Sequence, residues 1–73
     1  MSTLDNLYNA LTRKVQLANK DITREIVEDW VGRAGCEAQQ IAFMSIALGE
    51  LGRGRYTPEE LVGDILHLSC LDN

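Results

Sequence analysis

The sequence predicts an all-α protein, a small bundle of three to four helices around a central apolar helix at about residues 36–51. Two observations support this prediction. Apolar residues recur at steps of three and four along much of the chain, which is the spacing of a helix with one buried face. Residues 41–48 include seven apolar residues and no charged one, so we expect the rest of the chain to cover this helix on every side.

The length of 73 residues bounds the protein to one helical domain, residues 1–73, with a single core. Chains this short bury only about 60% of the surface that they expose when unfolded. The composition, 45% hydrophobic and 25% charged, is that of a globular domain rather than of a disordered tail. We therefore expect a folded domain of marginal stability, which dense helix packing or self-association would help to stabilise.

The first helix is expected to begin after Ser2 or Thr3, either of which can cap it, and to run to about Asn19. Its apolar residues form one stripe, whereas Leu17 lies off that stripe, where it is exposed or contacts another chain. The stripe consists of Leu4, Leu7, Tyr8, Leu11, Val15 and Ala18.

A tight turn at residues 20–23 is predicted next, with Asp21 or Thr23 capping a second helix that runs through Ala34. The alternative is one long bent helix, because the apolar spacing continues through Ile22 as a heptad seam. After Ile22 the apolar residues move to another face, which favours two helices.

The third helix is expected from about Cys36 to Leu51, after Gly35, which suits the left-handed residue that closes a helix. The two cysteines, Cys36 and Cys70, are too few and too far apart for a secreted disulfide scaffold. We expect both to be buried, reduced thiols.

Residues 52–56 form the clearest loop, and the clearest helix start follows it. Thr57 can cap the fourth helix, Pro58 suits its first position, and Glu60 can complete a capping box with Thr57. The apolar face of this helix consists of Leu61, Val62, Ile65 and Leu66, with Leu68 at its margin.

The charge balance indicates which kind of partner the protein can bind. Eleven acidic residues against seven basic ones give a net charge of −4 and a pI near 4.7. Such a field repels phosphate backbones, which disfavours nucleic acid, and fits basic surfaces of other proteins better. The start of the chain lacks the basic and apolar runs of a signal peptide, and residues 41–48 are too few to span a bilayer. We expect a cytoplasmic protein that uses no membrane.

A helix-turn-helix is the main alternative, using the second and third helices with Gly35 in the turn. Gln39 and Gln40 would then lie at the start of the recognition helix, and glutamine can read adenine. That helix offers no arginine or lysine for phosphate. A DNA-binding regulator therefore stays the second hypothesis.

Two short stretches supply candidate partner-binding residues. In the second predicted helix, acidic residues surround the only tryptophan, and together they would form an acidic rim around an aromatic anchor. The loop 52–56 places two arginines beside a tyrosine, a basic contact that would also suit a phosphate or carboxylate. The plain alternatives are a core tryptophan and a solvated loop. The candidates are Glu25, Asp29, Trp30, Arg53, Arg55 and Tyr56.

No catalytic set is visible in the sequence. The only histidine, His67, has no evident nucleophile partner. It shares one side of the fourth helix with Glu60 and Asp64, a group that is more typical of a charged surface than of a metal site. We therefore expect no enzyme, no metal and no cofactor.

In its short length, acidic charge, four predicted helices and lack of a chemical site, the chain resembles small accessory proteins of bacteriophages and prophages. This resemblance is one of general character, and it implies a regulatory protein that docks on a host or phage protein. The leading hypothesis is therefore a non-catalytic protein-protein interaction module that modulates a larger partner, and that also forms a homodimer.

Overall fold

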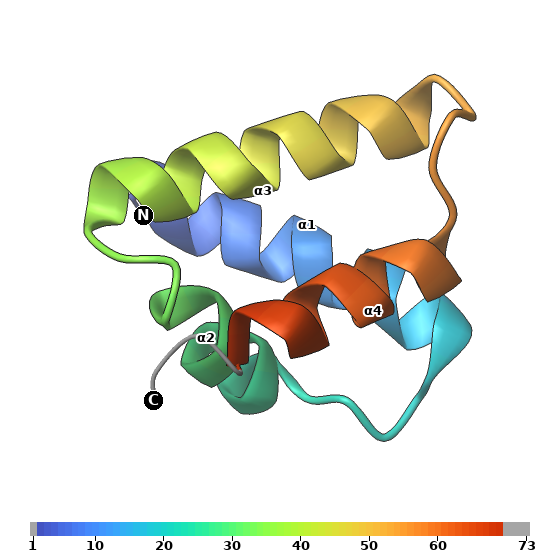
Figure 1. Ribbon diagram of the computed structural model, residues 1–73, viewed down its shortest axis with the longest axis horizontal. Helices are drawn as coiled ribbons and strands as arrows, with labels where there is room; N and C mark the ends of the chain where they lie inside the picture. The colour runs from blue at the N-terminus through green and yellow to red at the C-terminus, as the bar shows by residue number, and fades with distance from the viewer. Residues whose placement is uncertain (1, 70–73) are drawn as a thin grey trace.

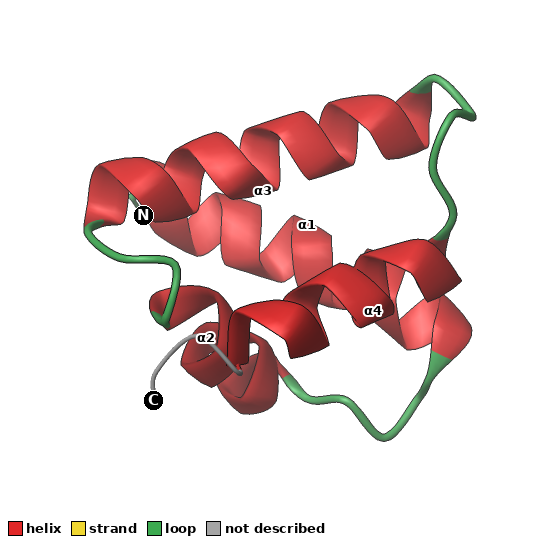
Figure 2. Ribbon diagram, in the orientation of Figure 1, coloured by secondary structure: helices red, strands yellow, loops and turns green. Residues whose placement is uncertain are grey.

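Four helices make up most of residues 2–69, the part of the chain that the computed structural model describes (Figure 1). No strand occurs within these residues (Figure 2). The predicted all-α bundle is therefore confirmed, and the chain leaves the helical path between the first two helices rather than forming one long bent helix. The helices are α1 (Thr3–Ala18), α2 (Arg24–Gly32), α3 (Glu37–Gly52) and α4 (Pro58–Ser69).

Local capping explains where these helices begin. The side-chain oxygens of Ser2 and Thr23 accept hydrogen bonds from amides of the first turns of α1 and α2, at 3.1 and 3.4 Å. At α4 the amide of Glu60 donates to Thr57 Oγ1 at 3.2 Å, and the amide of Thr57 donates to Glu60 Oε1 at 3.1 Å. These bonds satisfy amides that a helix cannot pair internally, and they confirm the predicted capping box.

The joint between α2 and α3 depends on Gly35, whose φ of +123° lies where other residues are strained, as predicted. Next to it, Cys36 is the N-cap of α3, and its amide donates to Gln39 Oε1 at 2.9 Å. Cys36 is exposed, so the prediction of a buried thiol is wrong at this position. The reason is that a helix N-terminus in a surface joint has nothing packed over it. Cys70 lies outside the described residues.

The helix at the centre of the packing is α1, which lies closely against each of the other three helices. α4 packs on α1 and α2, whereas α3 packs chiefly on α1 and barely touches α4. Leu11 and Val15 of α1 are completely buried in the middle. Among residues 2–69, the buried apolar core consists of Tyr8, Leu11, Val15, Ile22, Val27, Val31, Met44, Ala47, Leu61 and Ile65.

The helix α3 is not covered on every side, which corrects the expectation for residues 41–48. Only Met44 and Ala47 of this stretch are buried, and the side chain of Ile46 is 68% exposed. Figure 1 shows why, because α3 runs along one edge of the molecule with α1 beneath it. Helices packed on one side leave the opposite side in solvent, however apolar it is. Within residues 2–69, no helix is both long and apolar enough to cross a membrane.

Candidate partner-binding surface

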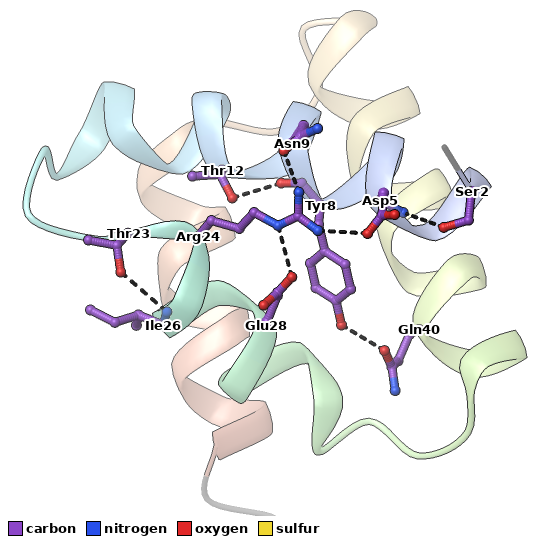
Figure 3. A network of polar contacts seen from close by, with 10 residues as sticks. All are labelled: Ser2, Asp5, Tyr8, Asn9, Thr12, Thr23, Arg24, Ile26, Glu28 and Gln40. Carbon is purple, nitrogen blue, oxygen red and sulfur yellow. Dashed lines mark hydrogen bonds and ion pairs between the residues drawn. The ribbon is translucent and has the colours of Figure 1, made fainter.

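A polar network centred on Arg24 joins α1 to α2 (Figure 3). The guanidinium group donates to Asp5 through Nη2 at 2.8 Å, to Asn9 through Nη1 at 2.7 Å and to Glu28 through Nε at 2.8 Å. It also lies 5.9 Å from the centre of the Tyr8 ring, within the range of a cation-π contact. The hydrogen bond from Arg24 lowers the pKa of Asp5.

Tyr8 extends this network to α3. Its hydroxyl donates to Gln40 Oε1 at 2.6 Å, and its carbonyl accepts from Thr12 Oγ1 at 2.7 Å. Burial raises the pKa of Tyr8, so its hydroxyl stays a donor. We call Asp5, Tyr8, Asn9, Arg24, Glu28 and Gln40 the Arg24 network. Its bonds tie α1 to α2 and α3 within one chain, while the side chains of Asp5, Arg24 and Glu28 stay 35–46% exposed.

Between α3 and α4 the surface is open. An open hollow of about 210 Å³ lies there, and we call it the α3–α4 hollow. Its residues are apolar or aromatic apart from two acids, and the hydroxyl of Tyr56 donates to the carboxylate of Asp64 across one wall. The lining consists of Phe43, Ile46, Ala47 and Glu50 of α3, Tyr56 of the following loop, and Asp64 of α4.

The charged groups that line the α3–α4 hollow are the carboxylates of Glu50 and Asp64. Glu50 is paired with Arg53 at 3.3 Å, and the arginine side chain is 62% exposed. Burial, and then the hydrogen bond to Asp64, raises the pKa of Tyr56 far above its usual value. The phenol therefore stays protonated and keeps donating to Asp64. The hollow thus combines an apolar lining with an acidic rim.

Three of the predicted partner-binding residues lie at the loop that bounds this hollow. Arg53 makes its ion pair with Glu50, Arg55 is exposed, and Tyr56 is half-buried in the wall. The amide of Arg55 donates to the carbonyl of Glu50 at 3.1 Å, which folds the loop back against the end of α3. Of the three, only Tyr56 lines the hollow.

The other three predicted residues lie on α2, on the opposite side of the molecule from that loop (Figure 1). Trp30 is half-buried against the core, Glu25 is exposed, and Asp29 lies 3.6 Å from Arg33 in an ion pair. The packing of Trp30 favours its structural role. The six candidates therefore do not form one surface.

Sequence reasoning missed the α3 residues of the hollow. Phe43, Ile46, Ala47 and Glu50 are spaced as one stripe of a helix, so the signal was present in the sequence. A helix that is apolar on most of its circumference, however, does not show which stripe its neighbours leave uncovered. Only the position of α4 decides that point.

The two glutamines of the DNA-binding alternative make hydrogen bonds within the chain. Gln40 accepts from Tyr8 at 2.6 Å and donates to the carbonyl of Gly35 at 2.9 Å, and Gln39 accepts from the amide of Cys36 at 2.9 Å. These bonds orient both side chains toward groups of their own chain. This arrangement gives the DNA-binding hypothesis no support.

Among residues 2–69, no group of three or more His, Cys, Asp or Glu residues is placed to hold a metal ion. The side chains of Glu60 and Asp64 instead bond to Thr57 and Tyr56.

Three comparisons with known proteins identified no relative of this chain. A scan against protein-family models found no match, and searches of curated proteins and of solved structures found none either.

Proposed function

We propose that the chain is a non-catalytic protein-interaction module of the cytoplasm, which modulates a larger partner protein by docking through the α3–α4 hollow. The observation that supports this proposal most is the exposed side chain of Ile46, at 68%, beside an apolar hollow. Leaving an isoleucine in water forfeits about 1.5–3 kcal/mol relative to burying it. A partner that covers Ile46 would recover that free energy.

The α3–α4 hollow differs from a single exposed apolar side chain, because several of its apolar residues lie next to one another. Single exposed apolar residues are normal on soluble proteins, whereas apolar patches bordered by polar groups mark interaction sites. Ile46 adjoins Phe43 and Ala47 in the α3–α4 hollow, with carboxylates at the rim. The net charge of −4 favours a partner whose docking surface is basic.

Affinity capture with matched variants tests the proposal. Ile46→Ser removes the apolar anchor, and Leu17→Ser removes an equally exposed side chain, 72%, on another helix. From a lysate of the source cells, we expect wild type and Leu17→Ser to retain the same protein, and Ile46→Ser to lose it. Equal retention by all three chains would exclude the α3–α4 hollow as the docking surface.

The regulatory part of the proposal, a phage-type accessory role, needs a functional readout. Adding wild-type protein to the purified partner should change the partner's activity, and adding Ile46→Ser should not. A partner that binds the wild type without any change in its activity would leave the module an adaptor rather than a modulator.

A further inference from the structure

We propose that a second copy of this chain also fits the α3–α4 hollow, with the exposed Leu17 of one copy entering the hollow of another. Basic residues around Leu17 then meet the acids on the rim. The contact itself depends only on these two surfaces. Its role, control of access to the hollow, rests on the proposed function.

The inserting surface is the end of α1. Leu17 is 72% exposed and points away from the core, whereas Val15 is completely buried. Arg13 and Lys14 precede Leu17 by four and three residues, so they lie on its side of the helix. Lys20 follows in the turn, and all three basic residues are exposed. We call Arg13, Lys14, Leu17 and Lys20 the α1 basic patch.

The α3–α4 hollow complements the α1 basic patch, because it offers an apolar lining to the leucine and carboxylates to the basic residues. The apolar lining suits a leucine side chain, and the rim carries Glu50 and Asp64. The ion pair of Glu50 with Arg53 is exposed, and such pairs are weak, so an incoming lysine or arginine can replace it. Asp64 accepts from Tyr56, and a carboxylate has further lone pairs for a second donor.

A second copy is the occupant that the described residues favour. Among residues 2–69, the two most exposed large apolar side chains are Leu17 and Ile46, on different helices. Arg13, Lys14 and Lys20 lie near Leu17, whereas Glu50 and Asp64 line the hollow beside Ile46. One contact covers both apolar side chains. The net charge of −4 on each copy opposes association at longer range, so we expect a weak, concentration-dependent contact.

The contact joins two different surfaces, so it is heterologous, and each copy carries both halves. Association therefore closes on itself or continues beyond a dimer. A copy that occupies the hollow excludes a larger partner from it. Self-association would thus lower partner binding as the concentration of the protein rises.

Mixing two variants tests this arrangement. Leu17→Ser keeps an intact hollow and Ile46→Ser keeps an intact α1 basic patch, so an equimolar mixture retains one complete contact. In sedimentation velocity we expect wild type to associate and each variant alone to lose about tenfold or more in affinity. The mixture should form a heterodimer of the two variants.

Controls separate this result from misfolding and from the proposed function. All variants should keep the wild-type circular dichroism spectrum, and Leu66→Ser, at a 44% exposed position of α4, should associate like wild type. A wild-type chain that stays monomeric up to its solubility limit, or a mixture that stays monomeric, would overturn the proposal. Partner capture by Leu17→Ser would still test the proposed function in either case.

Discussion

Two seams of the bundle differ in how the chain closes them. At the α1–α2 seam, Arg24 donates to Asp5, Asn9 and Glu28, so opposite charges meet within one chain (Figure 3). At the α3–α4 seam, apolar side chains and two acids surround an open hollow of about 210 Å³. The first seam pairs its charged groups with one another, whereas the second leaves apolar area uncovered. The comparison teaches that a small bundle can close one seam with paired charges and still leave apolar area open to solvent at another.

The largest expected effect is on stability, and it distinguishes a residue of the core from a residue of the open α3–α4 seam. Leu11 is completely buried in α1, so Leu11→Ala should lower the free energy of unfolding by about 2–5 kcal/mol. Ile46→Ala removes an exposed side chain and should change it by no more than about 0.5 kcal/mol. Urea denaturation measures both values. Equal losses would mean that α3 is covered as fully as α1.

The next expected effect concerns the closed seam. Arg24→Met leaves Asp5 and Glu28 without their shared cation, so we expect a lower Tm than for wild type. Arg53→Met removes only the exposed pair with Glu50 and is the matched control, with a smaller shift. Thermal denaturation followed by circular dichroism compares the two. An equally small decrease in Tm for both variants would contradict the central role of Arg24 in the network.

A smaller effect compares the two tyrosine hydroxyls. Tyr8→Phe removes the donor to Gln40 in a partly buried bond of 2.6 Å, which should cost about 1 kcal/mol. Tyr56→Phe removes a bond to Asp64 that water can replace, so the loss should be smaller. Denaturant unfolding of both variants gives the ranking, and the reverse order would contradict the contrast between the seams.

The smallest expected effect is a dependence on pH. Arg24 lowers the pKa of Asp5 below its ordinary value of 3.8, so the folded state binds this proton less readily than the unfolded state. The resulting stabilisation is present above pH 3.8 and is lost as the pH falls through the folded pKa. Asp5→Asn should therefore flatten the loss of stability in acid. Urea denaturation of wild type and Asp5→Asn at a series of acid pH values checks this difference.

The sequence was sufficient where structure depends on neighbouring residues. Thr57, Pro58 and Glu60 predicted the start of α4, because a capping box involves residues only three apart. Gly35 likewise predicted a left-handed joint. Each of these features is decided within a turn of helix, so no knowledge of distant contacts was needed.

The sequence was insufficient where structure depends on distant segments. Arg24 lies nineteen residues from Asp5, and no local pattern pairs them. The hydropathy of residues 41–48 indicated a helix suited to burial, but it does not say how many helices lie against it. Since α4 packs on α1 and α2, one side of α3 stays open. Because of this arrangement of helices, the candidate surface includes Ile46 rather than the Trp30 that the sequence suggested.

One measurement tests most directly whether the α3–α4 seam is open. In a chain with labelled isoleucine methyl groups, dilute enough to be monomeric, a soluble paramagnetic probe broadens the signals of exposed methyl groups. We expect strong broadening for Ile46, which is 68% exposed, and none for Ile65, which is completely buried. An Ile46 signal as protected as that of Ile65 would mean that α3 is covered, and the hollow would then not be available to a partner or to a second copy.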